Sequence, residues 1–576
     1  MKNLLKYFKG SAVIFAILAP LSMILEVSMD LLHPTLLSNI IDIGVAEANI
    51  NYILKVGAYM IIVSILAVIG GVLCSFFASA ASMRLAEDLR EAIFKKVNSL
   101  SFMEIDKLKT ASLITRLTND VTQVQQMFNM ALRAAVRSPL MAIGGIIMAV
   151  RLSLNLSTIF AVSIPIIIIG IIIILKKSMP LFIKVQNKLD DINLVMRENI
   201  LGVRVIKSFN LEEKQKERFN KKNKELTVSS IASQNMNLVL SPFTQLIMNL
   251  SVVAVLWFGG RMVSYQTLEL GKIMAFVNYM IQIMHSTVMV INLMMNFSRA
   301  KASADRINEI LNMASSIKEK EDAKKLEGYD IEFRNVYFKF NEESENVLED
   351  ISFSIKEGER IGIIGPTGSG KSTIISLIPR LYDIYKGEIL IGGINVKELK
   401  LKELRDNIGI VLQESLLLSG DIEGNIRFGN NFATFKEIEK SAKDAQAYEF
   451  INKKKNKYKE KVEQRAKNLS GGQKQRLSIA RTLVRNPKIL IMDDASSALD
   501  MKTQSKLHEA IKNRDDGATI ITIAQRISAV MASDKIIVLD EGRISAIGSH
   551  DELIRNNEIY RTIAVSQLGE EVLSNV

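Results

Sequence analysis

Long uncharged stretches recur six times in the first half of the chain, and they constrain the fold more than any other feature of the sequence. A bilayer-spanning helix needs about 20 apolar residues, so four stretches are clear spans, while the first and third need flanking residues. The stretches are Ser11 to Leu25, Val56 to Met83, Ser138 to Val150, Leu152 to Leu175, Leu226 to Gly260 and Ile273 to Ser298. The sequence therefore predicts an all-α domain with six membrane-spanning helices.

Basic residues gather at one side of these spans. The long connections 84–137 and 176–225 are rich in Lys and Arg, and Lys2, Lys6 and Lys9 precede the first span. The positive-inside rule places both termini and both connections in the cytoplasm, and we expect the membrane helices to continue into these connections. This accounts for much of the net charge of +12, so we expect no nucleic-acid partner. The basic start resembles a signal peptide, but no small-residue cleavage pattern follows, so we expect a retained first helix.

The composition indicates a chain divided between two solvents. Its 576 residues exceed the usual size of one domain, and 48% hydrophobic residues are combined with 23% charged residues. We expect a six-helix transmembrane domain with cytoplasmic extensions at 1–314, a charged linker at 315–328 and an α/β domain at 329–576. The single cysteine, Cys74, excludes a disulfide framework and a Cys-based metal cluster.

A phosphate-binding loop is predicted early in the α/β domain. An apolar strand at 360–364 leads into Gly-Pro-Thr-Gly-Ser-Gly-Lys-Ser at 365–372, and a helical segment follows. This is the G-x-x-x-x-G-K-[ST] pattern in its required context, so backbone N–H groups and a helix N-terminus can cradle phosphates. Lys371 would reach the β- and γ-phosphates, and Ser372 would bind Mg²⁺. The residues predicted to hold the nucleotide here are Gly365, Gly368, Ser369, Gly370, Lys371, Ser372 and Thr373.

Two further motifs lie downstream of this loop. The apolar strand 488–492 ends at Asp493, whose carboxylate can hold the magnesium shell in the manner of a Walker B residue. Before it, Leu-Ser-Gly-Gly-Gln at 469–473 precedes a helical stretch. This arrangement predicts a second helix N-terminus that binds an anion. It does not identify the molecule that carries the anion.

Together these motifs resemble the ATPase of an ABC transporter. The phosphate loop, Gln413, the signature sequence at 469–473, Asp493 and the Ser-Ala-Leu-Asp sequence at 497–500 occur in the order and spacing of that family. Joined to six spans, nearly the whole chain resembles an ABC exporter half-transporter. The resemblance implies an ATP-driven translocase with the type IV ABC exporter fold and a P-loop ABC nucleotide-binding domain.

The same resemblance implies how the ATPase residues work in a dimer. Two such domains pack head to tail, so the signature of one subunit contacts the γ-phosphate held by the other. The signature residues expected there are Ser470, Gly471, Gly472 and Gln473, and Asp500 would lie at the same interface.

Further roles follow from the resemblance. Gln413 would contact Mg²⁺ or water and report nucleotide to the membrane domain, although a structural glutamine stays possible. Phe340 matches the position of an adenine-stacking tyrosine, with a core aromatic as the alternative. The segments 102–107 and 208–213 match short coupling helices that dock into the ATPase domains, and the alternative for both is a solvated amphipathic face.

Two catalytic positions depart from the hydrolytic members of the family. After Asp493 those members have a glutamate that polarises the attacking water, but this chain has the shorter Asp494. They also have a histidine that positions the γ-phosphate, where this chain has Gln525. A third departure precedes the signature, where 463–466 read Glu-Gln-Arg-Ala instead of Gly-Glu-Arg-Gly. Asp494 and Gln525 predict a site that binds ATP and hydrolyses it poorly.

A degenerate site combined with an intact signature is typical of a heterodimer. The sequence resembles the degenerate-site subunit of bacterial heterodimeric ABC multidrug exporters, which lends its signature to a partner half-transporter with an intact Walker B Glu and switch His. The resemblance implies a multi-pass protein of the bacterial cytoplasmic membrane, in contact with lipid. Three alternatives stay open: a homodimer with slow hydrolysis, a lipid or peptide exporter driven by the same ATPase domains, and a regulatory subunit that senses nucleotide.

A polar stripe on the sixth span is the candidate substrate site. Its members recur at spacings of four and three, which places them on one helix face: Asn278, Gln282, His285, Met289, Asn292 and Asn296. A second polar row recurs at spacing four on the fifth span: Asn237, Ser241, Gln245 and Asn249. Glu26 and Asp30, in the first span, must face a cavity or a partner. Such rows either line a cavity or form hydrogen bonds between helices. If they line a cavity, we expect it to bind bulky amphipathic substrates, cations included.

Overall fold

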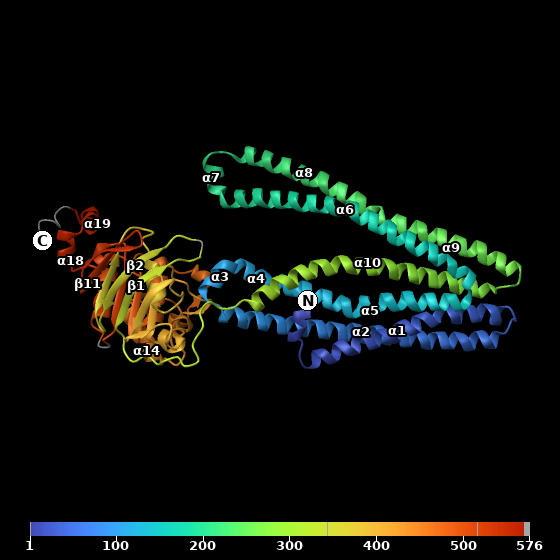
Figure 1. Cartoon of the computed structure of the whole chain (residues 1–576), viewed down its shortest axis with the longest axis horizontal. Helices are drawn as coiled ribbons and strands as arrows, with labels where there is room; N and C mark the ends of the chain where they lie inside the picture. The colour runs from blue at the N-terminus through green and yellow to red at the C-terminus, as the bar shows by residue number, and fades with distance from the viewer. Residues whose placement is uncertain (1, 343, 515–516, 570–576) are drawn as a thin grey trace. The chain divides into compact units, whose positions relative to one another are not determined.

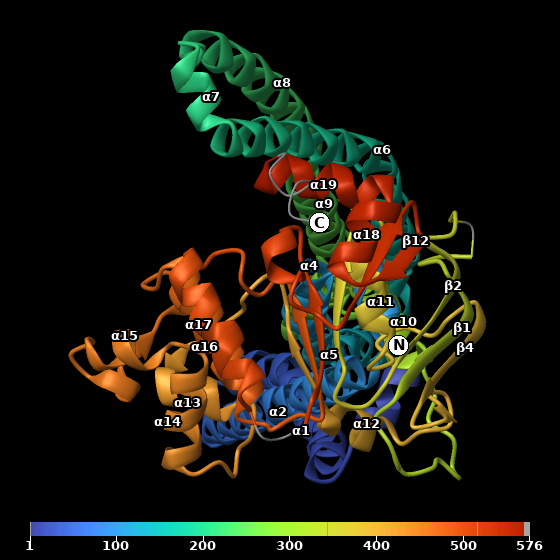
Figure 2. The same cartoon turned by 90° about the vertical axis from the view of Figure 1, so that its left-hand side faces the viewer.

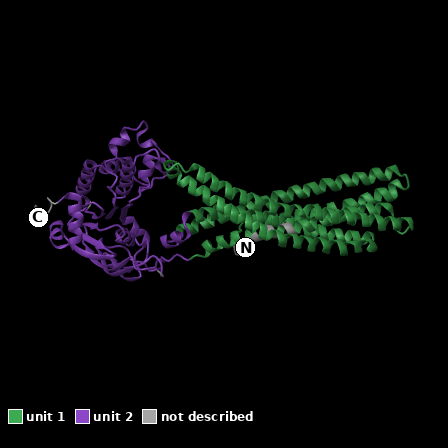
Figure 3. Ribbon diagram, turned by 90° about the horizontal axis from the view of Figure 1, so that it is seen from above, with its two compact units in different colours: residues 1–98, 111–313 green, residues 99–110, 314–576 purple. Residues whose placement is uncertain are grey.

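The computed structural model describes residues 2–342, 344–514 and 517–569, which form two compact units (Figure 3). Unit 1 comprises residues 1–98 and 111–313, and unit 2 comprises residues 99–110 and 314–576. The segment 99–110 thus belongs to unit 2, although the chain on both sides of it belongs to unit 1.

Unit 1 is built from long helices. The described residues contain six helices that are long and apolar enough to cross a membrane. This confirms the predicted number of spans. The main helices are α1 (Ser11–Asn39), α2 (Ile50–Ser99), α5 (Val121–Leu152), α6 (Leu154–Leu201), α8 (Glu212–Leu238), α9 (Leu240–Ser264) and α10 (Leu270–Asn312). At 1.5 Å per residue, the 50 residues of α2 extend about 75 Å, far beyond the roughly 30 Å of a hydrocarbon core. The helices therefore continue outside the membrane.

Helices α1, α2, α5 and α10 pack into a bundle through small residues and a few polar contacts (Figure 1). A Cβ added at Gly70 of α2 would lie 2.9 Å from the backbone nitrogen of Glu26, so α1 and α2 approach closely there. The buried Tyr279 of α10 reaches α1, where its hydroxyl donates to the Leu31 carbonyl at 2.6 Å and lies 2.7 Å from the Thr35 hydroxyl. These contacts fix α10 against α1.

Helices α6 and α8 form an antiparallel pair joined by the short helix α7 (Val203–Ser208), and toward α7 the pair diverges from α5 and α10 (Figure 1). The predicted short helix at 208–213 is wrong in position, because α7 begins and ends five residues earlier. Asn210 has a left-handed backbone (φ +52°), which stops α7. Glu212 and Glu213 instead open α8, where acidic side chains favour a helix N-terminus.

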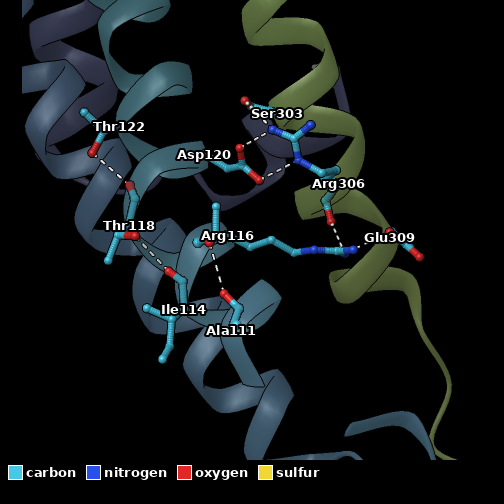
Figure 4. A network of polar contacts seen from close by, with 10 residues as sticks. Ala111, Ile114, Arg116, Thr118, Asp120, Thr122, Ser303, Arg306 and Glu309 are labelled. Carbon is cyan, nitrogen blue, oxygen red and sulfur yellow. Dashed lines mark hydrogen bonds and ion pairs between the residues drawn. The ribbon is translucent and has the colours of Figure 1, made fainter. Parts of the chain in front are cut away.

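The long helical stretch of the third span contains a π-helical turn, η3 (Arg116–Asp120), between α4 (Thr110–Thr115) and α5. Figure 4 shows the ion pairs that join this turn to α10. The buried Asp120 accepts two hydrogen bonds from the Arg306 guanidinium, and Arg116 donates to the Arg306 carbonyl and pairs with Glu309, both at 2.8 Å. This arginine and carboxylate network ties the third span to the sixth.

Unit 2 is an α/β domain, as predicted. Its central sheet has the order β12-β11-β3-β10-β9-β6, and all neighbours are parallel except β11 and β12. The strands are β3 (Arg360–Ile364), β6 (Ile408–Val411), β9 (Ile489–Asp493), β10 (Thr519–Ile523), β11 (Lys535–Asp540) and β12 (Arg543–Gly548). A second, antiparallel sheet has the order β2-β1-β4-β5. It contains β1 (Ile331–Phe338), β2 (Leu348–Ile355), β4 (Lys386–Ile391) and β5 (Ile394–Asn395).

A helical subdomain occupies one side of unit 2, and β1, β2 and β4 lie on the other (Figure 2). It contains α13 (Ile422–Arg427), α14 (Phe435–Asp444), α15 (Tyr448–Asn452), α16 (Gly471–Leu483) and α17 (Met501–Lys512). Separate apolar clusters support the sheets and this subdomain. Two terminal helices, α18 (His550–Asn556) and α19 (Glu558–Leu568), pack on a third cluster that includes the chain after β10.

Candidate functional site

The predicted phosphate loop joins β3 to α11 (Lys371–Leu377) in the central sheet. A Cβ at Gly365 would lie 2.1 Å from the Leu539 carbonyl oxygen, so no side chain fits where the loop leaves the sheet. Gly370 precedes α11 with a left-handed backbone (φ +92°), and a Cβ there would lie 2.6 Å from the Leu348 side chain. The glycines thus allow a tight loop that ends at a helix N-terminus.

Lys371 folds back over this loop. Its ammonium donates to the carbonyls of Gly365 and Pro366, at 3.0 and 2.7 Å, and it is 8% exposed. Burial lowers the pKa of Lys371, while the carboxylates of Asp493 and Asp494 oppose the shift. A cation held among carbonyls and short of counter-ions is suited to attract a polyphosphate.

Asp493 ends β9 beside the start of α11. The Ser372 hydroxyl donates to its carboxylate at 3.3 Å, and Asp493 is 6% exposed. Burial raises the pKa of Asp493, whereas the Ser372 hydrogen bond and the Lys371 charge oppose the shift. A hydroxyl and a carboxylate this close offer the oxygen ligands that Mg²⁺ prefers, and Mg²⁺ takes its remaining ligands from water and phosphates. The residues present therefore fit a magnesium ion.

A pocket of about 360 Å³ brings these groups together. The predicted residues that line it are Gly368, Gly370, Lys371, Ser372, Thr373, Gln413, Asp493, Asp494 and Gln525. Gly365 and Ser369 support the loop without lining the pocket, although the Ser369 hydroxyl contacts the Lys371 ammonium at 3.3 Å. The sequence reasoning missed Val347, Thr367 and Ile523 in the wall; Thr367 could have been included because it lies inside the motif.

Asp494 and Gln525 both line this pocket. Asp494 has a left-handed backbone (φ +47°), and its backbone N–H donates to the Ile523 carbonyl at 2.9 Å. Burial raises the pKa of Asp494, opposed by the charge of Arg526 and by a hydrogen bond from the Gln525 backbone N–H. The two residues that depart from the pattern of the hydrolytic family members therefore line one pocket.

The signature forms the N-terminus of α16. Ser470 caps this helix, with its hydroxyl accepting from the Gln473 N–H at 3.4 Å while the Gln473 side chain accepts from the Ser470 N–H at 3.1 Å. Ser470 and Gly471 are exposed, and none of the signature residues lines the pocket above. The buried Gln475 ties α16 to the chain after β9, donating to the Asp494 carbonyl at 3.3 Å. The exposed Asp500 caps α17 and accepts from the Thr503 N–H at 2.9 Å.

Phe340 lies in an aromatic cluster of unit 2 outside the pocket wall. Its ring is 40% exposed and meets Phe338 and Tyr382 edge-on, with ring centres 4.9 and 5.5 Å apart. Tyr382 also contacts α3 (Phe102–Leu108), the first predicted coupling helix, since the Phe102 and Tyr382 rings are 6.2 Å apart. A half-exposed aromatic ring can stack on a planar base.

A cavity of about 940 Å³ in unit 1 lies among α1, α2, α5 and α10. Glu26 and Asp30 of α1 line it, and both pair with Arg137 of α5, at 3.4 and 2.8 Å. The wall from α2 is mainly apolar. Residues of α5 that the sequence reasoning missed supply most of the polar wall: Gln125, Gln126, Asn129, Arg133 and Arg137.

The structure does not bring the polar stripe of α10 together at this cavity. Met289 lines the cavity, whereas Asn278 and His285 are exposed and Gln282 is half-buried. The Gln282 side-chain oxygen is buried without a hydrogen-bond partner among the described residues. Asn292 and Asn296 lie in α10, but their side chains are outside the part that the structure describes.

The second polar row, on the fifth span, is likewise divided. Asn237 accepts from Ser178 of α6 at 2.8 Å, which is an interhelical hydrogen bond. Gln245 donates to Asn249 on its own helix at 3.2 Å, and Ser241 is exposed.

Comparison with known proteins identifies two families along the chain. Residues 16–287 match the ABC transporter transmembrane region, and residues 348–497 match the ABC transporter domain. The uncharacterized ABC transporter ATP-binding protein YfiB of Bacillus subtilis is 38% identical over 571 residues, covering 99% of both chains. YgaD of the same organism, provisionally named a multidrug export ATP-binding/permease protein, is 32% identical and covers 85% of both chains.

A solved structure has the same fold over nearly the whole chain. It is the structure of a bacterial Atm1-family ABC exporter with ATP bound, with a TM-score of 0.81 and 25% sequence identity. The likeness covers 97% of this chain and 99% of that chain.

Proposed function

This chain belongs to the ABC transporter family as an exporter half-transporter, and from that premise we propose that it is the degenerate-site subunit of a heterodimeric multidrug exporter. Half-transporters of this kind work as dimers, drive transport with ATP and cross the membrane several times. In our proposal, residues 1–314 form the transport path, 315–328 the linker and 329–576 the motor. The chain binds ATP on its own phosphate loop but hydrolyses it slowly.

The observation that carries this proposal is that Asp494 and Gln525 line the same pocket as Lys371 and Asp493. A general base must reach its water within about 2.6 to 3.2 Å, and aspartate is one methylene shorter than glutamate. Glutamine is neutral and cannot carry the charge of a protonated histidine. Two changes that meet at one place weaken activation of the water, while the residues for phosphate and metal remain.

ATP binding follows from the family, and we propose that Mg²⁺ accompanies it. Ser372, Gln413 and Asp493 would hold the ion, which would neutralise charge on the β- and γ-phosphates. Lys371 and the backbone of the phosphate loop would hold those phosphates. Phe340 would stack on the adenine.

The exposed, capped signature supports the partner part of the proposal. Ser470, Gly471, Gly472 and Gln473 do not line this chain's own pocket, so they are free to complete a site on another subunit. The proposed partner is a second half-transporter with the Walker B glutamate and the switch histidine. Asp500 would lie at the same interface.

We place the exporter in the bacterial cytoplasmic membrane with both termini and the motor in the cytoplasm. The basic connections support this orientation by the positive-inside rule. The curated relatives above are bacterial proteins, which supports the proposed membrane.

The proposed substrates are bulky amphipathic compounds. The cavity of about 940 Å³ has an apolar wall from α2 and a polar wall from α5, and its size is in the range of drug-sized ligand sites. The sequence suggests that the Glu26 carboxylate attracts cations. In the structure this carboxylate already pairs with Arg137, so its charge is less available to a cationic substrate. A cationic substrate would have to compete with Arg137 for Glu26 and Asp30.

Reconstitution tests the proposal. The chain is purified alone and together with a second half-transporter from the same genome that carries the glutamate and histidine, and ATP-dependent dye export is measured in proteoliposomes. We expect the chain alone to bind ATP and export little, and the pair to export dye. Export by the chain alone at the rate of the pair would favour the homodimer. ATP binding without export of dye, lipid or peptide by the pair would favour a regulatory subunit.

A further inference from the structure

The C-terminal helix α19 reaches the chain beside the nucleotide pocket through one side chain, Gln567. Its amide nitrogen donates to the backbone carbonyl of Gln525 at 2.7 Å, and its amide oxygen accepts from the backbone N–H of Ile527 at 2.8 Å. A single amide thus spans the backbone on both sides of Arg526.

The sequence of α19 explains why Gln567 is held there. Tyr560, Ala564 and Gln567 follow at spacings of four and three and so share one face of the helix. Tyr560 and Ala564 are buried in the same apolar cluster as Ala524 and Ile527. The Tyr560 hydroxyl also lies 2.7 Å from Nδ1 of His550 in α18. The buried part of this face fixes the helix, and Gln567 continues it toward the pocket.

The Gln525 backbone is held at its carbonyl, which accepts a hydrogen bond from the Gln567 amide at 2.7 Å. The side chains of Gln525 and Arg526 are exposed, so the apolar cluster holds this segment at Ala524 and Ile527 and not at the two residues between them. Without Gln567, the segment would lose both of the hydrogen bonds that come from α19.

We propose that Gln567 is a positioning residue that holds Gln525 in the phosphate pocket and so lets the site distinguish ATP from ADP. Gln525 occupies the position that meets the γ-phosphate in the proposed function, on which this inference rests. ADP has no γ-phosphate, so its binding depends on the phosphate loop and not on the Gln525 segment. The role acts through Gln525, and Gln567 itself does not touch nucleotide.

The test compares nucleotide affinities of the full-length chain in nanodiscs by calorimetry, with MgADP and with the non-hydrolysable analogue MgAMP-PNP. Gln567→Met keeps the length of the side chain and removes both hydrogen bonds. Gln567→Glu keeps the acceptor for Ile527 but places a carboxylate against the Gln525 carbonyl. Ser566→Ala, at the neighbouring exposed position, is the matched control, since its hydroxyl bonds only within α19.

We expect Gln567→Met and Gln567→Glu to weaken AMP-PNP binding about fivefold, the scale of one lost neutral hydrogen bond, and to leave ADP binding within about twofold. Ser566→Ala should change neither affinity. Amide hydrogen exchange at Ile527 should become faster in Gln567→Met and stay near the wild-type rate in Gln567→Glu, which keeps the acceptor for this N–H. Equal weakening of both nucleotides, or no change in either, would overturn the positioning role. Failure of the wild-type chain to bind either nucleotide would instead contradict the proposed function.

Discussion

The hydroxyl of Tyr382 donates a hydrogen bond to the Asp106 carboxylate in α3 at 2.7 Å. The same ring meets Phe340 edge-on, so Tyr382 touches both the short helix that comes from the first half of the chain and the ring proposed to stack on adenine. Burial and the Asp106 carboxylate raise the pKa of Tyr382, so its hydroxyl keeps its proton at neutral pH. Tyr382 is therefore placed to report nucleotide to α3.

Tyr382→Phe should separate nucleotide binding from transport. The variant keeps the ring contacts and loses the hydrogen bond to a carboxylate, worth about 1.5 to 3 kcal/mol when buried and less at this partly exposed position. We expect ATP affinity within about twofold of wild type and about a threefold drop in dye exported per ATP hydrolysed. Tyr385→Phe is the control, because Tyr385 is 65% exposed and its ring contact is with Lys339. Equal losses of affinity and export would mean that the hydroxyl supports the nucleotide site alone.

Removing Asp494 should matter little in the assembled exporter. Because this carboxylate activates water poorly in our proposal, Asp494→Ala should change the turnover of the heterodimer by less than about twofold, whereas a working general base contributes about 10²-fold or more. Steady-state ATP hydrolysis by the reconstituted pair provides the measurement. A converse variant, Asp494→Glu with Gln525→His, should raise hydrolysis by the chain alone. A loss with Asp494→Ala as large as that from removing the partner's glutamate would contradict degeneracy.

Blocking the signature should stop the partner's site. Ser470→Arg places a long side chain at the exposed N-terminus of α16, and we expect at least about a 100-fold loss of hydrolysis by the heterodimer, the scale of a removed catalytic group. Ser470→Ala is the matched control, because it removes the cap, at a cost of about 1 kcal/mol, without adding bulk. If the two variants lose activity equally, loss of the Ser470 hydroxyl and not the added bulk explains the effect.

As pH falls, ATP binding should lose its dependence on Mg²⁺ at a higher pH than it would with an aspartate of ordinary pKa. Burial raises the pKa of Asp493, so its carboxylate takes up a proton at higher pH than the usual value near 3.9, and a protonated carboxyl no longer holds Mg²⁺. The gain in ATP affinity on adding Mg²⁺, measured as pH is lowered, should fall through this raised pKa. Asp493→Asn should show little gain at any pH.

The effect of Asp493 on folding has the opposite sign. Because the folded state binds this proton more tightly than the unfolded state, Asp493 favours folding as pH falls. Protonation of Asp493 therefore does not unfold the protein. If the dependence on Mg²⁺ is lost only at the pH where the protein unfolds, this residue is not the cause of the loss.

Arg137→Met should destabilise the membrane unit by leaving Glu26 and Asp30 without their partner. Breaking a fully buried pair costs about 3 to 5 kcal/mol, and the loss should be smaller here because Arg137 is 40% exposed. The triple variant Glu26→Gln, Asp30→Asn and Arg137→Met should recover most of the stability, since no uncompensated charge remains. Thermal unfolding in detergent measures both. If the triple variant is less stable than Arg137→Met, the pairs stabilise by more than charge neutralisation.

Local motifs explain why the nucleotide pocket could be predicted and the membrane cavity could not. The phosphate loop specifies its own geometry within a few residues, so Lys371, Ser372 and their neighbours were expected together. The cavity depends on which helix faces pack. The stripe on α10 is spaced to share one face, yet its members with described side chains divide between the cavity, the surface and a half-buried position.

A usable signal for the cavity lay in the third span. Gln125, Asn129, Arg133 and Arg137 recur at spacing four, but they occupy a connection whose charges were assigned to the cytoplasmic side. The contact of Gln567 with Gln525 spans 42 residues and depends on how α19 packs, so no pattern in the sequence indicates it.

The π-helical turn at Arg116–Asp120 also sets how the third span tolerates insertions and deletions. A wider turn accommodates one residue more than an α-helical turn, and each residue of an α-helix corresponds to about 100° of rotation. Deleting one residue here would therefore convert the turn to an α-helical one and leave the directions of α4 and α5 nearly unchanged, whereas deleting one residue from the regular part of α5 would rotate the two parts relative to each other by about that angle. The π-helical turn is thus the place where the third span can lose one residue and keep its alignment with the sixth, while the same loss in the regular part of α5 would alter that alignment without touching a residue of the nucleotide site.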